Sequence, residues 1–94
     1  MTGLIEPDEM VRLVCSAMGV PYQRLMDKSR RPDVVDARSV AAFVLRTRYG
    51  FSYPQLAPFL GCKDHTSAMY HFGRTEQTPS LAEKARTFLV EVAA

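Results

Sequence analysis

The stretch that most constrains the fold runs from Gly61 to Phe72, where a tight turn leads into a helix with a polar start. Gly61 suits the positive φ of such a turn, and Asp64 suits the N-cap because its carboxylate can accept from unpaired backbone N–H groups. Three apolar residues then follow at helical spacing and are expected to face a core: Ala68, Met69 and Phe72. A helix that presents hydrogen-bonding groups at its N-terminal end after a turn is typical of a helix-turn-helix.

The preceding segment predicts the first helix of that motif. Ser52 and Gln55 stand at the spacing of a capping box, and Pro54 fits the first helical turn. Pro58 lacks the N–H that a regular helix interior needs, so we expect this helix to be short, bent or partly 3₁₀. The predicted helix-turn-helix therefore spans about residues 52–74.

Apolar periodicity predicts further helices on both sides of the motif. The first begins at Pro7 and ends at Gly19, with a predicted buried stripe of Met10, Leu13, Val14, Ala17 and Met18. A short helical turn follows at residues 21–26, and a last amphipathic helix is expected at about residues 80–92, with Leu81, Ala85, Phe88, Leu89 and Val92 on one face.

A second long helix is predicted from about Asp33 to Arg48 and ends at Gly50. Its predicted buried stripe is Val34, Ala37, Val40, Ala41, Val44 and Leu45, and Arg38, Arg46 and Arg48 are expected to project from its other sides. No convincing strand alternation or internal repeat occurs. The sequence predicts an all-α fold of five or six short helices around one core, in a single domain over residues 1–94.

Chain length, hydropathy and cysteine content together indicate a small intracellular protein. A chain of 94 residues is large enough for one core and too small for two, and no apolar run approaches the length of a membrane span. The N-terminus lacks the features of a secretory signal. Cys15 and Cys62 do not form a disulfide-dense pattern, which favours a reducing cytoplasm with Cys15 as a core residue.

Charge is distributed unevenly along the chain. The formal net charge is +2, but the segment from Arg24 to Arg74 holds nine basic residues and four aspartates, a net +5. The two flanks together carry −3. Such asymmetry is typical of a polyanion-binding face, although a solvated basic surface would produce the same pattern.

These residues resemble the C-terminal DNA-binding domain of the bacterial replication initiator DnaA, a Trp-repressor-like helix-turn-helix domain. The Asp64-His65-Thr66-Ser67 signature carries the resemblance most specifically. Further matching residues lie in the basic loop, the long helix and the turn: Lys28, Arg30, Arg31, Val34, Arg38, Ser52, Pro54 and Gly61. The resemblance covers about residues 4–77, and the last predicted helix lies outside it.

The resemblance implies a set of DNA contacts. Asp64, His65 and Thr66 match residues that reach base edges in the major groove, and Arg30 matches an arginine inserted into the adjacent minor groove. Positions that match or neighbour backbone contacts are Lys28, Arg31, Arg38, Arg46, Ser52, Tyr53, Pro54, Lys63, Ser67, Tyr70 and Arg74. No cofactor and no metal is implied.

Several positions depart from the family pattern. Asp33 and Asp36 stand where neutral or basic residues are frequent, and Lys63 replaces the usual arginine and its bidentate fork. Cys62 and Pro58 replace a common glycine and a common acidic residue. These changes predict a different sequence preference or a lower affinity. The chain also has no Gly-x-x-x-x-Gly-Lys-Ser/Thr loop, so it is not expected to act as an initiator ATPase by itself.

Other kinds of site receive little support. No serine or cysteine nucleophile is placed with a base at recognisable spacing, so we expect no catalytic residue and no enzyme activity. Cys62, His65 and His71 could suggest zinc, but a fourth ligand is missing. Tyr70 is left open between a half-buried core position and a DNA-facing one.

Two functions follow from this sequence. The first is sequence-specific binding of double-stranded DNA by a stand-alone module, in replication-initiation control or transcription regulation in a bacterium or phage. Such a module would be cytoplasmic and nucleoid-associated, a monomer or weak homodimer, with replication-initiation or transcription proteins as further partners. The alternative is a protein-interaction regulator of the initiation machinery with weak or no DNA binding. An interaction module would have no need to keep Arg30 together with Asp64, His65 and Thr66.

Overall fold

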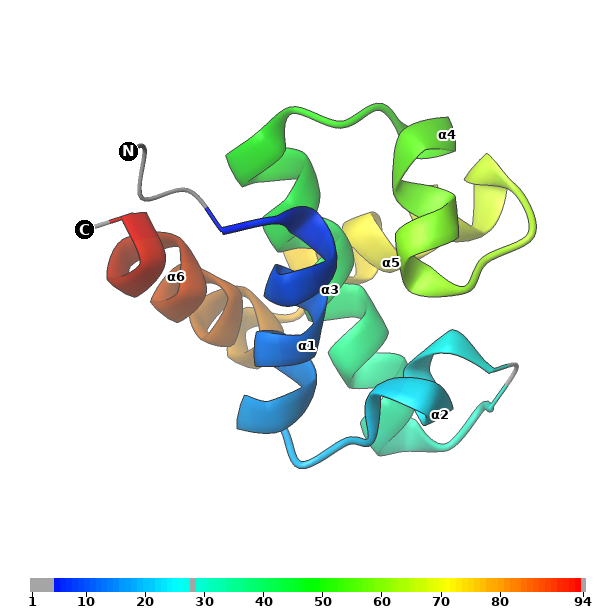
Figure 1. The fold of residues 1–94 in the computed structure, drawn as a ribbon, viewed down its shortest axis with the longest axis horizontal. Helices are drawn as coiled ribbons and strands as arrows, with labels where there is room; N and C mark the ends of the chain where they lie inside the picture. Colours follow the sequence, from blue (N-terminus) through cyan, green and yellow to red (C-terminus); the bar gives the residue numbers. More distant parts are fainter. Residues whose placement is uncertain (1–4, 28, 94) are drawn as a thin grey trace.

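The computed structural model describes residues 5–27 and 29–93, with side chains up to residue 89. In order, the elements are α1 (Pro7–Ala17), α2 (Tyr22–Met26), α3 (Pro32–Tyr49), α4 (Tyr53–Leu56), the 3₁₀ helix η1 (Ala57–Leu60), α5 (His65–Gln77) and α6 (Pro79–Ala93). Every regular element in the described ranges is helical (Figure 1), which confirms the expected all-α fold.

Helix α3 forms the centre of the fold, because α1, α2, α4, α5 and α6 all pack against it. Six consecutive residues, 37–42, are buried, so this helix has no fully polar face in its middle. The predicted apolar stripe of α3 is confirmed. The expectation that Arg38 projects outward is wrong, since only 7% of this residue is exposed and neighbouring elements cover the face on which it lies.

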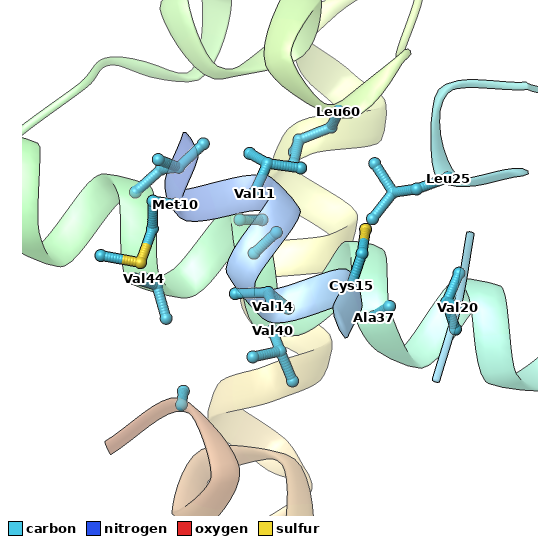
Figure 2. Packing of buried hydrophobic residues seen from close by; sticks show 14 of the residues in the cluster. Met10, Val11, Val14, Cys15, Val20, Leu25, Ala37, Val40, Val44 and Leu60 are labelled. Atoms are coloured by element: carbon cyan, nitrogen blue, oxygen red, sulfur yellow. The ribbon is translucent and has the colours of Figure 1, made fainter. Parts of the chain in front are cut away.

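Helix α1 packs across α3, and Figure 2 shows its side chains pointing toward Ala37, Val40 and Val44. Its buried face consists of Met10, Val11, Val14 and Cys15. The predicted burial of Leu13 and Ala17 is wrong, because Leu13 is 41% exposed and Ala17 is exposed. Two i, i+4 rows, 10/14 and 11/15, face the core together, and Leu13 and Ala17 lie outside both.

The chain from α4 to α5 has the local structure that its sequence predicts. Ser52 Oγ accepts from Gln55 N–H, and Gln55 Oε1 accepts from Ser52 N–H, which completes the capping box. After one turn the α-helix tightens into η1, where Pro58 stands. The prediction of a short and partly 3₁₀ helix is confirmed, because i→i+3 bonding tolerates the missing N–H better than a longer α-helix.

Helix α6 packs against α3 and α5 on the side of the molecule opposite the α2–α3 loop (Figure 1). Leu81 and Ala85 are buried, and Phe88 and Leu89 are partly buried against the same core. Val92, also predicted on this face, lies outside the described side chains. None of the helices in the described ranges has the length and hydropathy to cross a membrane.

Candidate nucleic-acid interface

Two segments from distant parts of the sequence meet at one end of the molecule. The loop between α2 and α3 and the turn before α5 lie at the same end in Figure 1. Together with the side of α5 they border an open groove of about 590 Å³. Six residues predicted to contact DNA line this groove: Arg30, Arg38, Lys63, Asp64, Ser67 and Tyr70.

The tip of α5 is an exposed, capped helix start. Asp64 is the N-cap, and its Oδ1 accepts from Ser67 N–H at 3.1 Å. The side chains of Lys63, His65 and Thr66 are exposed beside it. The tip therefore offers an ammonium, an imidazole and a hydroxyl group next to the positive end of the helix dipole, a set that can bond both base edges and phosphate oxygens.

The turn before this tip depends on Gly61. Its φ is +70°, and a Cβ at this position would stand 2.4 Å from the carbonyl oxygen of Met26. The turn thus packs directly on the C-terminal end of α2, where the basic loop begins. A side chain at position 61 would push the two groove-forming segments apart.

Arg38 lies beneath the groove and bonds to both segments. Its Nε donates to the carbonyls of Leu25 (3.1 Å) and Leu60 (3.2 Å). Its Nη2 donates to Leu25 (2.6 Å) and Asp27 (2.8 Å), and its Nη1 donates to Ser29 (3.3 Å). The predicted role as an outward phosphate contact does not fit this geometry, because the guanidinium is engaged by four main-chain carbonyls.

Three more residues predicted to touch the DNA backbone are half-buried and have partners within the protein. Arg46 donates to the Phe51 carbonyl at 2.9 Å and lies 4.1 Å over the ring of Tyr53. Arg74 pairs with Asp36 at 2.8 Å. These contacts could not be predicted from the sequence, and each of the three residues is only partly accessible.

The other predicted contact residues that the structure describes lie at the surface. Arg30 and Arg31 are exposed in the loop, and Arg31 also forms an exposed ion pair with Asp33 at 3.5 Å. Ser52 and Pro54 are exposed at the start of α4. Lys28 lies outside the described residues.

Beneath α5 lies a buried polar cluster that sequence reasoning missed. His71 is 7% exposed, and its Nδ1 lies 3.2 Å from Ser39 Oγ. The Ser39 hydroxyl donates to Val35 O and accepts from Arg74 Nη1, so His71 is left to donate through Nδ1–H. Burial first, then the charges of Arg38 and Arg74, lower the pKa of His71 from 6.5 to about 4.

The spacing of α5 contained a signal for this cluster. Ala68, His71, Phe72 and Thr75 recur at i, i+3, i+4 and i+7, and all four are buried or packed against the core. Met69, predicted to face the core, is instead 46% exposed. Tyr70 is 61% exposed and lines the groove, with its ring edge-on to His71.

Cys62 stands in the turn, half-buried, and burial raises the pKa of its thiol. Among the side chains that the structure describes, in residues 5–27 and 29–89, no three His, Cys, Asp or Glu residues gather as a metal site would need. The residues that line the groove include hydrogen-bonding and cationic groups.

Comparison with known proteins gives a consistent family. Residues 7–74 match the family described as the bacterial dnaA protein helix-turn-helix. The chain is 33% identical over 76 residues to the chromosomal replication initiator protein DnaA of Gloeobacter violaceus, covering 81% of this chain and 17% of that protein. It is 32% identical over 73 residues to the DnaA of a Synechococcus strain, covering 78% and 16%.

A third relative, the DnaA of Bacteroides fragilis, is 30% identical over 69 residues, covering 73% of this chain and 14% of that protein. The chain thus spans about a sixth of the length of the first two relatives. No solved structure matches. The matched region contains α1 to α4, η1 and most of α5, including the loop, the turn and the capped tip. On this evidence the chain belongs to the bacterial DnaA helix-turn-helix family.

Proposed function

We propose that this chain binds double-stranded DNA sequence-specifically, with α4, η1 and α5 as its helix-turn-helix. The observation that carries the proposal is that Arg30 and Asp64, the N-cap of α5, line the same groove, with the exposed His65 and Thr66 directly after Asp64 in the chain. Residues more than thirty positions apart in the chain are brought together, and none of their side chains is needed to fill the core. A surface built in this way suits a ligand that contacts both segments at once.

Each side of the groove has its own part in this proposal. His65, Thr66 and Asp64 enter the major groove, where imidazole, hydroxyl and carboxylate groups bond to base edges and the Thr66 methyl packs on thymine. Arg30 enters the adjacent minor groove, whose negative potential attracts a guanidinium. Exposed Arg30 has the freedom for that role, since its side chain lies outside the core.

The phosphate contacts are proposed for the residues that flank these two segments. Lys63, Ser67 and Arg31 are exposed, and α4 and α5 begin directly after the exposed N-cap residues Ser52 and Asp64. Such contacts set register without reading sequence. Lys28, Tyr53, Pro54, Tyr70 and the accessible parts of Arg46 and Arg74 complete the proposed set.

The biological setting is proposed from the relatives, which are chromosomal replication initiator proteins. We assign residues 1–94 to one DNA-binding module that acts in replication-initiation control or transcription regulation, as a monomer or weak homodimer. Proteins of those machineries are its proposed further partners. The module selects a site, and any step that consumes nucleotide belongs to other protein regions.

Selection from a random double-stranded DNA library tests the proposal, because it reports binding and sequence preference together. On the selected site, His65→Ala or Thr66→Ala is expected to cost about 1–3 kcal/mol, with little change on random DNA. Lys84→Ala, on exposed α6 away from the groove, is the matched charge control and should leave both affinities unchanged. Equal losses on the two DNAs for His65→Ala would show that it does not read bases.

Salt dependence provides an independent test of the interface. Contact with some four to six phosphates predicts a log–log slope of binding against salt of about −3 to −6. A flat response would contradict DNA binding and favour the alternative of a protein-interaction regulator. Lys63→Ala should make the slope about one unit shallower, because one phosphate contact is lost.

A further inference from the structure

Arg38 connects the two DNA-facing segments through backbone alone. The carbonyls of Leu25, Asp27 and Ser29 belong to the end of α2 and the loop that carries Arg30. The carbonyl of Leu60 ends η1, directly before the turn that leads to the α5 tip. A single guanidinium therefore holds main-chain atoms on both sides of the groove, next to the backbone contact at Gly61.

The geometry suits a guanidinium and no other side chain. Its planar fork directs N–H groups in fixed directions, and its three nitrogens make five hydrogen bonds to four carbonyls from three chain segments. A lysine ammonium is a compact point charge on a flexible stem and cannot reach both segments with this fixed spacing. Arg38 forms no ion pair with the described residues, so carbonyl dipoles, rather than a carboxylate, balance its buried charge.

We propose that Arg38 is a positioning residue that fixes the distance between the Arg30 loop and the recognition helix, and so sets the spacing of the two parts of the DNA site. This inference rests on the proposed DNA-binding function. One side of the site is read in the minor groove and the other in the major groove. A rigid separation between the two reading groups makes spacing along the DNA part of the specificity.

The consequence is testable with DNA that has one added base pair. An insertion between the half of the selected site that depends on Arg30 and the half that depends on His65 moves them apart by about 3.4 Å. A rigid protein then loses one half of its base contacts, a penalty of about 5- to 150-fold. A protein whose loop can shift recovers part of that loss.

The experiment compares the wild type, Arg38→Gln, Arg38→Lys and Val40→Ala on the selected site and on the site with the insertion. We call the bonds from Arg38 to the four carbonyls the Arg38 clamp. Val40 is buried on the same helix and does not line the groove, so Val40→Ala lowers stability while the clamp stays intact. The expected result is a penalty at least about 5-fold smaller in both Arg38 variants and unchanged in Val40→Ala. Arg38→Lys keeps the positive charge and the aliphatic stem, so it can replace Arg38→Gln in the experiment if the glutamine variant does not fold.

Three outcomes would overturn the proposal. A wild-type spacing penalty in Arg38→Gln would show that the clamp does not set spacing. A wild-type penalty in Arg38→Lys would show that charge alone is sufficient. If Val40→Ala reduced the spacing penalty as much as the Arg38 variants do, at an equal loss of stability, the effect would be one of general destabilisation.

A measurement without DNA separates this proposal from the proposed function. Backbone ¹⁵N relaxation dispersion is expected to show new exchange at residues 27, 29–31 and 61–66 in Arg38→Gln and none there in Val40→Ala. If the library yields no selected sequence but this exchange occurs, the DNA-binding proposal fails while the clamp stands. Unchanged relaxation in Arg38→Gln would overturn the clamp, whatever the DNA results.

Discussion

The loop after α2 and the centre of α3 each contribute an arginine, and the two residues are used in opposite ways. Arg30 is exposed at the edge of the groove. Arg38, eight residues later in the chain, is only 7% exposed and bonds to four carbonyls beneath the groove. The two histidines of α5 differ in the same way. His65 is exposed at the tip, and His71 is buried against Ser39. Polar residues in this basic segment therefore form two layers, one that faces a ligand and one that holds the first in place.

The largest expected effect separates the two arginines. Arg38→Ala should lower the free energy of unfolding by about 3 kcal/mol or more, because several buried carbonyls lose a charged donor and stay without water. Arg30→Ala should change it by no more than about 0.5 kcal/mol, as expected at the surface. Urea denaturation of both variants at pH 7 makes the comparison. If both variants lost similarly little free energy of unfolding, the Arg38 contacts beneath the groove would not be what holds the groove in place.

The second prediction separates the two histidines by pH. The pKa of His71 is lowered from 6.5 to about 4, so the folded state disfavours its protonation. Its contribution to stability is complete above pH 6.5 and is lost as pH falls toward 4, by about 3 kcal/mol over that range. Urea denaturation from pH 7.5 to pH 4 measures this loss.

Matched substitutions assign that pH dependence. His71→Gln should remove the part of the loss that falls between pH 6.5 and 4, because no imidazole remains to be protonated in the buried site. His65→Ala should keep it, since His65 is exposed. Identical pH profiles for wild type and His71→Gln would show that buried His71 does not titrate as its surroundings require.

The difference between the exposed layer and the buried layer explains which features of the fold and the site could be predicted from the sequence. Local signals were sufficient for the capping box at Ser52, the N-cap at Asp64 and the glycine turn at Gly61, because each depends on a few neighbouring residues. The family signature added the expectation that Arg30 and the tip act together, and the structure places both beside one groove. Whether these residues contact DNA stays a prediction.

Tertiary burial could not be predicted in the same way. Arg38 and Ser39 lie on sides of α3 that a surface helix would leave polar, but the middle of this helix, residues 37–42, is buried on all sides. On α5 the apolar character of Met69 predicts a buried residue, whereas the structure buries His71, which the same periodicity allows. Polarity alone does not separate a solvated side chain from a buried one with satisfied hydrogen bonds.

The third prediction tests the contact between the two segments at the backbone. Gly61→Ala forces an L-residue into φ +70° and places its Cβ against the Met26 carbonyl. The expected cost is about 2 kcal/mol or more, since the left-handed conformation alone costs about 1–2 kcal/mol and the close contact adds to it. Thermal unfolding measures the loss. A neutral Gly61→Ala would show that the turn can move away from α2 without cost.

Gly73 on α5 offers the smallest and opposite effect. It lies within the helix, and an added Cβ would meet nothing within 4 Å. Gly73→Ala should therefore raise the free energy of unfolding by about 0.5–1 kcal/mol, because alanine is the better helix former. Gly73 is not among the proposed DNA contacts, so this variant should bind the selected site as tightly as the wild type. A stabilised variant with lower affinity on that site would instead show that position 73 itself faces the DNA, between the proposed backbone contacts Tyr70 and Arg74.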